Sequence, residues 1–482
     1  MKLLTAEEMR ETDRTLIHRG VPSLLLMENA ACRVVEFLER EFAPLSAQRI
    51  LIVCGKGNNG GDGIAIARQL RLRHAGVKLW VLLTSDRAEL SADAEANLRM
   101  LDMCGSGGVF HEIQPEMYAA TIVLDALLGT GISGAAKAPS SEWIGRLNRD
   151  WPFAKKVAID IPSGMSSDLA ASEGEVVRAD YTVTFTAPKI GMVQWPNCES
   201  VGELIVGRIG CPDSWLDDVR LQLSDPADFR VLFAPRKLES NKGSYGHVLV
   251  VGGAAGKTGA AEMTGLAALR VGAGLVTVSS SGQMRAPELM TETPPSIDKK
   301  TVVAMGPGLG SDSAVQQQVR EWFAECPLPM VVDADGLNAL ASGNEWLKPA
   351  GARVFTPHPG EMARLVGSTV KDVQADRLNI VRRFAADRGV ILVLKGNRTV
   401  IATPDGRAWI NPTGTPAMAT AGTGDVLTGL IAGLIAQHPD RIELCVVAAV
   451  WLHGRCGELC GRLLIATDLL TKLREAIGEF SE

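Results

Sequence analysis

Hydrophobic residues follow a repeating pattern along most of the chain. Short apolar runs rich in β-branched residues end in glycine or an acidic residue, and stretches with helical spacing follow them. In the first half, the runs and their terminal loops occupy residues 50–53, 77–83, 121–131, 155–164 and 181–191. Apolar strands that alternate with helices are typical of a mostly parallel sheet covered by helices on both faces. The pattern therefore predicts an α/β fold, preceded by a helical stretch over residues 5–40.

A second series of the same kind begins after a break in the pattern. Between residues 211 and 246, charged residues and prolines interrupt the alternation. Further apolar runs with their loops then occupy residues 247–253, 275–280, 302–310, 329–336, 353–361 and 390–396. Residues 399–410 resemble a hairpin with Asp405 and Gly406 at its turn, and an apolar helix follows residue 421. We therefore predict two α/β domains, over residues 1–220 and 221–482.

Composition and charge narrow the class of protein. The chain has 482 residues, of which 46% are hydrophobic and 22% charged, which indicates a globular protein large enough for two domains. Its net charge is −6 without a long run of one sign, and no run of 18 apolar residues occurs. Nine dispersed cysteines favour reduced thiols over a disulfide framework. We therefore expect a cytoplasmic protein that binds neither nucleic acid nor membranes.

Polar residues in the first half lie where the predicted strands end. These residues are Asn58, Asn59, Asp62, Asp125, Asp160 and Ser163. The loop over residues 55–63 has five glycines in nine positions and leads into a helix, and residues 129–134 repeat this chemistry. Free N–H groups at a helix N-terminus bind phosphate at the carboxyl ends of parallel strands. The loop is neither a Walker A sequence nor a clean GxGxxG fingerprint, and the alternative is a tight strand-to-helix turn.

In the second half, the sequence AGTGDVLTG over residues 421–429 carries the strongest motif. Small residues at a helix start expose consecutive N–H donors that can hold a transferring phosphoryl group, and Asp425 can accept a proton from an attacking hydroxyl. The alternative is a helix cap formed by the aspartate. Lys395 ends a predicted strand and could reach phosphate, while His358 and Glu361 bring an imidazole and a carboxylate to the same sheet edge.

Together, these motifs resemble two known families. The sequences GKGNNGGDG, LDALLGTG and AIDIPSG, in this order, resemble the NAD(P)H-hydrate epimerase domain, or YjeF N-terminal domain, over residues 1–215. The sequences NKGSYG, GPGLG, TPHPGE, VLKGNRT and AGTGDVLTG resemble the ADP-dependent NAD(P)H-hydrate dehydratase over residues 225–480. The resemblance implies a Rossmann-like three-layer sandwich followed by a ribokinase-like α/β domain.

The first resemblance implies an epimerase site and a potassium site. The implied substrate-binding residues are Asn58, Asn59, Gly60, Gly61, Asp62, Gly129, Thr130, Gly131, Ile132, Ser133, Gly134, Ala135 and Asp160. Asn59, Asp125 and Ser163 would hold K⁺, a hard cation that suits oxygen donors. We assign proton transfer to Asp160, because interconversion of the R and S hydrates requires the C6 hydroxyl to leave or the nicotinamide ring to open. The alternative is that Asp160 only caps the following turn.

The second resemblance implies a dehydratase site. The implied residues are Ala260, Gly308, His358 and Asp425 for the hydrate, with Lys395, Gly396, Asn397, Arg398, Thr399 and Gly424 for ADP or AMP. Asp425 would deprotonate the C6 hydroxyl, ADP would phosphorylate it, and phosphate would then leave. Mg²⁺ would bridge the phosphates of the nucleotide.

The two resemblances on one chain imply a bifunctional repair enzyme that acts on hydrated NADH and NADPH (NADHX and NADPHX) with ADP as co-substrate. We also expect a homo-oligomer. A small-molecule kinase that uses the same glycine loop is an alternative, and it would yield a stable phosphorylated product. A further alternative is that the first half is a noncatalytic nucleotide-binding or scaffold module.

Overall fold

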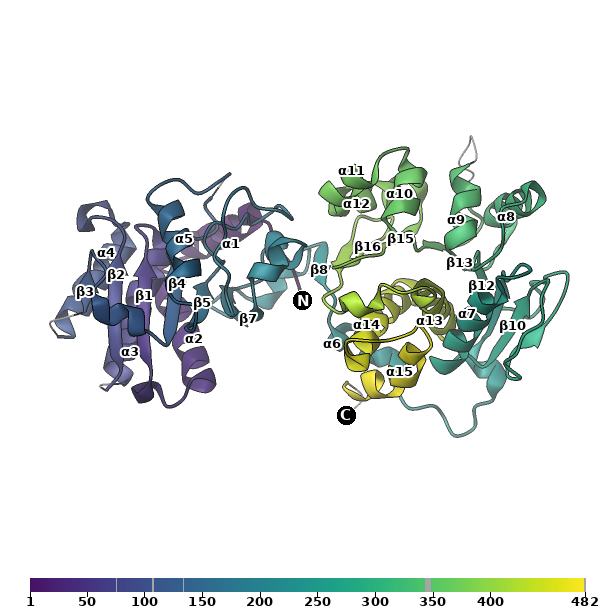
Figure 1. Cartoon of the computed structure of the whole chain (residues 1–482), viewed down its shortest axis with the longest axis horizontal. Coiled ribbons are helices and arrows are strands. Elements are labelled where there is room, and N and C mark those ends of the chain that lie inside the picture. Colours follow the sequence, from purple (N-terminus) through teal and green to yellow (C-terminus); the bar gives the residue numbers. More distant parts are fainter. Residues whose placement is uncertain (75, 106–107, 133, 343–347, 481–482) are drawn as a thin grey trace. The chain divides into compact units, whose positions relative to one another are not determined.

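The computed structural model describes residues 1–74, 76–105, 108–132, 134–342 and 348–480. These residues form two compact units, one of Lys2–Val219 and the other of Met1 with Arg220–Glu482. Each unit has a sheet of its own with helices on both faces, as Figure 1 shows. The predicted α/β class is therefore confirmed.

The first unit is built on a seven-stranded sheet in the order β3-β2-β1-β4-β5-β6-β7. Every pairing in this sheet is parallel. The strands are β1 (Arg49–Cys54), β2 (Lys78–Leu83), β3 (Val109–Phe110), β4 (Ile122–Ala126), β5 (Lys155–Ile159), β6 (Tyr181–Phe185) and β7 (Glu203–Gly207). The chain reverses its direction of winding beside β1, and ligands bind outside the carboxyl ends of strands at such a switch point.

Helices cover both faces of this sheet because side chains alternate along each buried strand. In β1, Ile50 and Ile52 join one hydrophobic cluster, while Leu51 and Val53 join the cluster on the opposite face. The helices are α1 (Ala6–His18), α2 (Ser23–Glu41), α3 (Asn58–Arg73), α4 (Ala92–Met103) and α5 (Ser140–Arg149). Residues of α2, α3 and α4 belong to the first cluster and residues of α5 to the second. The result is the predicted three-layer sandwich.

The second unit has a ten-stranded sheet in the order β11-β10-β9-β12-β13-β14-β15-β16-β17-β8. Its pairings are parallel except β15 with β16 and β16 with β17. The strands are β8 (Leu221–Leu223), β9 (His247–Val251), β10 (Leu275–Ser279), β11 (Met290–Thr291), β12 (Val302–Met305), β13 (Met330–Val332), β14 (Arg353–Phe355), β15 (Ile391–Leu394), β16 (Val400–Ala402) and β17 (Ala408–Ile410). The winding reverses between β9 and β12, which gives this sheet a switch point of its own.

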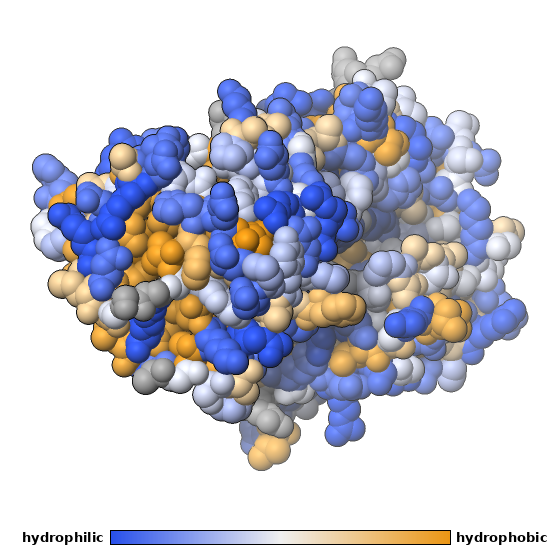
Figure 2. All heavy atoms as spheres, turned by 60° about the vertical axis from the view of Figure 1, so that its left-hand side comes forward, coloured by the Kyte–Doolittle hydropathy of each residue, from blue (hydrophilic) through white to orange (hydrophobic). Residues whose placement is uncertain are grey.

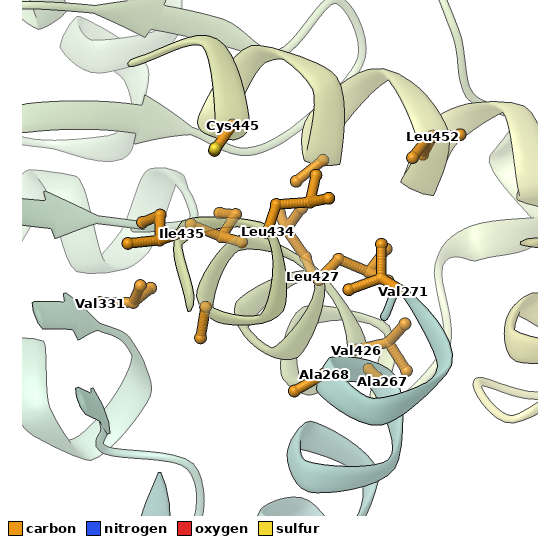
Figure 3. Packing of buried hydrophobic residues seen from close by; sticks show 14 of the residues in the cluster. Ala267, Ala268, Val271, Val331, Val426, Leu427, Leu434, Ile435, Cys445 and Leu452 are labelled. Carbon is orange, nitrogen blue, oxygen red and sulfur yellow. The ribbon is translucent and has the colours of Figure 1, made fainter. Parts of the chain in front are cut away.

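The main core of the second unit lies where three helices pack together against the sheet. Its helices are α6 (Pro226–Phe229), α7 (Thr258–Arg270), α8 (Ser313–Glu325), α9 (Ala334–Ala341), α10 (Pro359–Val366), α11 (Val370–Ala375), α12 (Arg377–Arg388), α13 (Thr423–Gln437), α14 (Ile442–Cys460) and α15 (Asp468–Gly478). Figure 3 shows side chains of α13 between those of α7 and α14, with Leu427 and Leu434 among them. Because α13 is buried along its length, its first turn has a fixed position at the sheet edge.

Two local features of the second unit show where the sequence pattern succeeds and where it fails. The hairpin around Asp405 and Gly406 is confirmed, with β16 and β17 antiparallel and Gly406 in the left-handed region at a φ of 86°. The charged segment between the two series contains β8, which the pattern does not predict. This three-residue strand pairs with β17 at the edge of the second sheet, and it is too short to show any alternation.

The surface and the thiols complete the description. Most of the face seen in Figure 2 is hydrophilic, and hydrophobic side chains form separate areas within it. No helix in the described part of the chain is long and apolar enough to cross a membrane. All nine cysteines are free thiols, as the sequence predicts.

Candidate active sites

A cavity of about 670 Å³ lies at the carboxyl ends of β1, β4 and β5 in the first unit. Among the residues predicted for this site, those that line the cavity are Asn58, Asn59, Asp62, Gly129, Thr130, Gly131, Ile132 and Asp160. Of the other predicted residues that the structure describes, Gly60, Gly61, Gly134 and Ala135 do not line it. Ser133 lies outside the described residues. The two loops that follow β1 and β4 therefore form one wall together.

Glycine is required in the first loop by close backbone packing. A Cβ atom on Gly60 would lie 1.8 Å from the carbonyl oxygen of Gly55, and one on Gly55 would lie 1.9 Å from that of Leu127. By contrast, a Cβ atom on Gly57 or Gly131 would meet open space. Glycine thus has two roles here, because some positions allow segments to approach each other and others leave room beside the cavity.

Asp160 enters the cavity from the end of β5 and forms an ion pair with a buried lysine. Its backbone has a φ of 65°, a conformation that residues other than glycine adopt only when their surroundings impose it. The carboxylate accepts hydrogen bonds from the Lys189 ammonium and from the Thr184 hydroxyl. Lys189 is fully buried, and its Nζ also donates to Thr184 Oγ1 at 2.8 Å. These contacts fix the position of Asp160.

Two further carboxyl groups lie close to this pair. Burial, together with the negative charges of Asp160 and Asp13, raises the pKa of Asp62 well above its usual value. Burial and the charge of Asp160 also raise the pKa of Asp13 to about 6, although Lys189 opposes this shift. Both residues line the cavity. The carboxyl groups of Asp13, Asp62 and Asp160 therefore lie near the Lys189 ammonium.

Asn59, which lines the cavity, lies close to Asp125 and Ser163. Ser163 donates from Oγ to Asp125 Oδ1 at 2.6 Å and from its backbone N–H to Asp125 Oδ2 at 2.8 Å. Asn59 Nδ2 donates to the Leu128 carbonyl at 2.9 Å, and Asn59 Oδ1 is buried without a hydrogen-bond partner among the described residues. Burial raises the pKa of Asp125 to about 6. The structure therefore brings the three predicted potassium ligands together and leaves one of their oxygens unpaired.

In the second unit, the first turn of α13 carries the predicted base. Gly422 precedes the helix in the left-handed region at a φ of 92°, so the chain turns sharply into α13. Asp425 lies in this turn, and Thr264 of α7 donates to its carbonyl oxygen at 3.1 Å. Burial and the nearby charge of Asp333 raise the pKa of Asp425 to about 6, while Lys395 opposes the shift. The carboxyl group can therefore exchange a proton near neutral pH.

Lys395 connects the end of β15 with the first turn of α13. Its Nζ donates to Asp333 Oδ1 at 2.8 Å, and Thr428 Oγ1 donates to Asp333 Oδ2 at 2.8 Å. A Cβ atom on Gly424 would lie 3.3 Å from Lys395 Nζ. Burial alone would lower the pKa of Lys395, but Asp333 and Glu361 outweigh this effect and raise it. The ammonium is therefore charged and lies beside the N-terminus of α13.

The other predicted residues lie in loops around this centre. Lys395 Nζ lies 3.9 Å from Glu361 Oε2. The same oxygen accepts a hydrogen bond from the backbone N–H of His358 at 2.8 Å. The His358 side chain is half exposed at the start of α10, where its Nδ1 accepts from the backbone N–H of Gly360 at 3.0 Å. The structure therefore brings His358 and Lys395 to one sheet edge through Glu361.

Ala260 and Gly308 meet at the switch point of the second sheet. Gly308 has a φ of 59°, and a Cβ atom there would lie 3.3 Å from the Ala260 Cβ. Asp335 accepts from the backbone N–H of Gly310 at 2.9 Å and lies 3.4 Å from Lys257 Nζ. The charge of Asp335 also contributes to the raised pKa of Asp425. The glycine loop after β12 thus neighbours the first turn of α13.

The predicted nucleotide-binding residues 395–399 form the turn between β15 and β16. Lys395 donates its backbone N–H to the Pro357 carbonyl at 2.9 Å. Arg398 has a φ of 55°, and Thr399 Oγ1 donates to the Gly396 carbonyl at 3.0 Å. Asn397 lies in the same turn. The turn begins at Lys395, whose Nζ lies beside Gly424. The turn is therefore at the same sheet edge as the start of α13.

Sequence reasoning missed several residues of the two sites. Asp333 and Asp335 directly follow the buried strand β13, so the strand-end rule applied to the first half would have found them. Lys189 follows β6 in the same way. Asp13 carries a weaker signal, because it occupies a polar position between the buried residues Met9 and Leu16 of α1. In the described part of the chain, no group of three or more His, Cys, Asp or Glu residues could hold a metal ion.

Two family models match separate parts of the chain. The model for the YjeF-related protein N-terminus matches residues 23–191, and the model for NAD(P)H-hydrate dehydratase matches residues 248–478. These matches fall within the first and second units respectively.

Full-length relatives and one solved structure extend this similarity. A bifunctional NAD(P)H-hydrate repair enzyme of Moorella thermoacetica is 40% identical over 524 residues, which cover 100% of this chain and 98% of that protein. A protein of the same name from Escherichia coli is 34% identical, covering 90% of this chain and 85% of its own. The crystal structure of an ADP/ATP-dependent NAD(P)H-hydrate dehydratase of Bacillus subtilis, co-crystallised with ATP and Mg²⁺, has a TM-score of 0.50 and 34% identity. It covers 54% of this chain and 98% of that one.

Proposed function

The chain belongs to the family of bifunctional NAD(P)H-hydrate repair enzymes, and we propose that each of its activities resides in one unit. The first unit, Lys2–Val219, interconverts the R and S hydrates of NADH and NADPH. The second unit, Arg220–Glu482, dehydrates the S form with ADP and releases NAD(P)H, AMP and phosphate. The observation that carries this assignment is Asp425, which lies with a raised pKa in the first turn of α13 beside the Lys395 centre.

In the first unit, Asp160 transfers the proton that epimerisation requires. The reaction must break and re-form a bond at nicotinamide C6, and a carboxylate at that carbon can serve as base and acid. Two contacts and one position support this role, since Lys189 and Thr184 hold the carboxylate and Asp160 lines the cavity. The loops with Asn58, Asp62 and 129–132 bind the rest of the dinucleotide from the same wall.

In the second unit, Asp425 acts as the base. It removes the proton of the C6 hydroxyl, and that oxygen then attacks the β-phosphorus of ADP while AMP departs. Phosphate then leaves C6 as the lone pair of ring N1 forms a C=N bond, and loss of a C5 proton restores the ring of NAD(P)H. Lys395 and the free N–H groups at the start of α13 stabilise the transferring phosphoryl group.

Asn59, Asp125 and Ser163 hold K⁺ in the first unit. The buried Asn59 Oδ1 without a partner supports this role, because an unpaired buried oxygen is costly unless a ligand satisfies it. Amide, carboxylate and hydroxyl oxygens are suitable donors for this hard cation. When bound, K⁺ would supply positive charge beneath the loops that bind the dinucleotide.

Mg²⁺ in the second unit needs few protein ligands. The ion usually keeps several waters and binds through one or two carboxylates and the phosphates of the substrate. Glu361, which is held by His358 and lies 3.9 Å from Lys395, is the carboxylate that we assign to its water shell. When bound, Mg²⁺ would neutralise charge on the phosphates.

The assay that tests both activities is incubation of the purified chain with a mixture of R and S hydrates, ADP and Mg²⁺. We expect complete recovery of the absorbance of the reduced nicotinamide, with one phosphate and one AMP formed per hydrate. Conversion of the S share alone would contradict the epimerase assignment of the first unit. A stable phosphorylated product without recovery of absorbance would instead support the small-molecule kinase.

A further inference from the structure

The cavity of the first unit contains more carboxyl groups than cations to balance them. Lys189 forms an ion pair with Asp160. Among the described residues, no lysine or arginine forms an ion pair with Asp13 or Asp62. One buried ammonium can balance only one carboxylate, and a second carboxylate in the same site retains a proton to a higher pH. The cavity therefore has protons available close to Asp160.

Asp13 is held in this cavity by the segment that precedes α1. Leu4 pairs with Lys189 as an isolated parallel bridge, with hydrogen bonds from Leu4 N to the Pro188 carbonyl at 3.0 Å and from Ile190 N to the Leu4 carbonyl at 3.1 Å. The same strand-like contact therefore fixes both the start of α1 and the lysine that binds Asp160. Met9 of α1 packs beside Leu4, so the helix presents this face to the cavity.

The carboxyl group of Asp13 has an unsatisfied atom. Its Oδ1 is buried and accepts no hydrogen bond from the described residues. An unpaired buried oxygen costs about 1–3 kcal/mol of stability, a cost often found where a group has a role in catalysis. Asp13 lines the cavity from α1, whereas Asp160 enters it from the end of β5. The two carboxyl groups therefore reach the substrate space from different elements.

We propose that Asp13 is a second catalytic residue of the epimerase site, which transfers a proton in partnership with Asp160. This inference rests on the proposed epimerase function of the first unit. Asp13 in its acid form donates a proton to the C6 hydroxyl. The C6–O bond breaks, water leaves, and the lone pair of ring N1 forms a C6=N1 double bond.

The second half of the reaction reverses these steps on the other face of the ring. Water attacks C6, Asp160 takes up one of its protons, and the electron pair of the C=N bond returns to N1. The net change is inversion at C6, with one proton moved from Asp13 to Asp160. Exchange with cavity water resets the pair, and conversion of the opposite epimer uses the two residues in exchanged roles. No oxidant or reductant is required.

Asp13 fits this role better than Asp62, another carboxyl group of the cavity without an ion pair among the described residues. Burial and the negative charges of Asp160, Asp13 and Asp93 raise the pKa of Asp62 well above its usual value. The pKa of Asp13 is raised to about 6, and a group that transfers protons is most effective with a pKa near the working pH. Asp62 also lies within the first turns of α3, in the loop proposed to bind the dinucleotide.

The experiment compares Asp13→Asn with Glu11→Gln, a matched change at an exposed α1 residue that pairs only with Arg14 among its neighbours in the described chain. Epimerisation is followed with one purified epimer as substrate, by chromatographic separation of the R and S forms. We expect kcat to fall about 100-fold or more in Asp13→Asn, with KM for the hydrate changed less than about threefold. Glu11→Gln should match the wild type, and Asp13→Glu should recover part of kcat.

Three outcomes would overturn the proposal. Wild-type kcat in Asp13→Asn would do so directly, as would a rise in KM alone, which indicates a binding role. Equal losses in Asp13→Asn and Asp13→Glu, with a lower thermal midpoint, would show a structural role. A full loss of kcat in Asp62→Asn with little loss in Asp13→Asn would assign the proton to Asp62. Failure of the wild type to epimerise either hydrate would instead reject the proposed function of the whole unit.

Discussion

The two sites each combine buried carboxyl groups with one lysine, but they use the lysine differently. In the first unit, Lys189 is fully buried and holds Asp160. In the second unit, Lys395 is 21% exposed and lies between Asp333, Glu361 and the first turn of α13. A fully enclosed ammonium can balance a protein carboxylate only, whereas a partly open one can also contact a phosphate that enters from solvent. The difference suits proton transfer in one site and phosphoryl transfer in the other.

The carboxyl groups that do the chemistry differ in the same way. Asp160 has a direct cationic partner, and the neighbouring Asp13 has none among the described residues. Asp425 forms no direct ion pair with any described residue, and it lies near the pair formed by Lys395 and Asp333. In both sites, one carboxyl group pairs directly with the ammonium group, and a second one nearby has a raised pKa.

Asp425→Asn should remove dehydration and leave epimerisation intact. Loss of a general base costs about 10²–10⁴ in rate, so we expect kcat for release of phosphate from ADP and the S hydrate to fall by this factor. The rate of R-to-S conversion should stay within about twofold of the wild type. Asp440→Asn, a surface change just after α13, is the control for folding of this region. Near wild-type dehydration in Asp425→Asn would show that another group is the base.

Lys189→Met should destabilise the first unit by about 3–5 kcal/mol, because it leaves the Asp160 charge in a buried place without its partner. The measurement is the unfolding transition of this unit in urea. The matched control is the double variant Lys189→Met/Asp160→Asn, which removes both charges and should recover much of the lost stability. If the double variant is no more stable than Lys189→Met, the lysine acts through packing and the contrast between the two lysines is lost.

The rate of dehydration should decrease below pH 6. Asp425 must be ionised to accept a proton, and its pKa is raised to about 6. The ionised fraction therefore falls about tenfold for each pH unit below that value, and kcat at saturating ADP should follow it. A profile that stays flat down to pH 5 would contradict the assignment. Epimerisation uses the acid form of Asp13, so we expect its rate not to show the same decrease at low pH.

Asp13→Asn should stabilise the folded protein at pH 8 by roughly 1–2 kcal/mol. The pKa of Asp13 is about 6 in the folded state, above the ordinary 3.8 of an aspartate, so the folded state binds the proton more tightly. The burial cost of the carboxylate is fully present above pH 6, decreases as the pH falls, and vanishes below about 3.8. Because the Asp13 side chain is partly exposed, the gain in stability is smaller than the full pKa shift would give. Urea unfolding at pH 8 and pH 4 measures it, and an equal gain at both values would point to another cause.

The sequence was sufficient to predict the fold class and the strand ends that surround each site. Buried runs such as 50–53 and 391–394 are long enough to show their strand character, and the hairpin at Asp405 carries its own turn signal. The short strands β3, β8 and β11 lie outside the repeating apolar runs and could not be predicted. Their place depends on pairing with a sheet that only the folded chain provides.

The prediction of site residues had a different limit. Residues at the end of a strand, such as Asp125 in β4 and Asp160 after β5, were identified from the sequence because topology brings strand ends to one edge. Asp13 lies on a helix far from that edge in sequence, and contacts such as the pairing of Leu4 with Lys189 bring it to the cavity. Lys189 was overlooked because a lysine after a strand is usually solvated, whereas its burial depends on the packing of several segments. The proposed roles of all these residues stay predictions.

The tight contact between Gly60 and Gly55 affects how any survey of substitutions in this protein should be interpreted. A saturation scan would find both positions intolerant, and the usual conclusion would be that they bind the ligand. Their intolerance would arise instead from contact between two backbone segments. Gly57 and Gly131, where a side chain would meet open space, are the positions at which loss of activity without loss of protein abundance would report on the ligand.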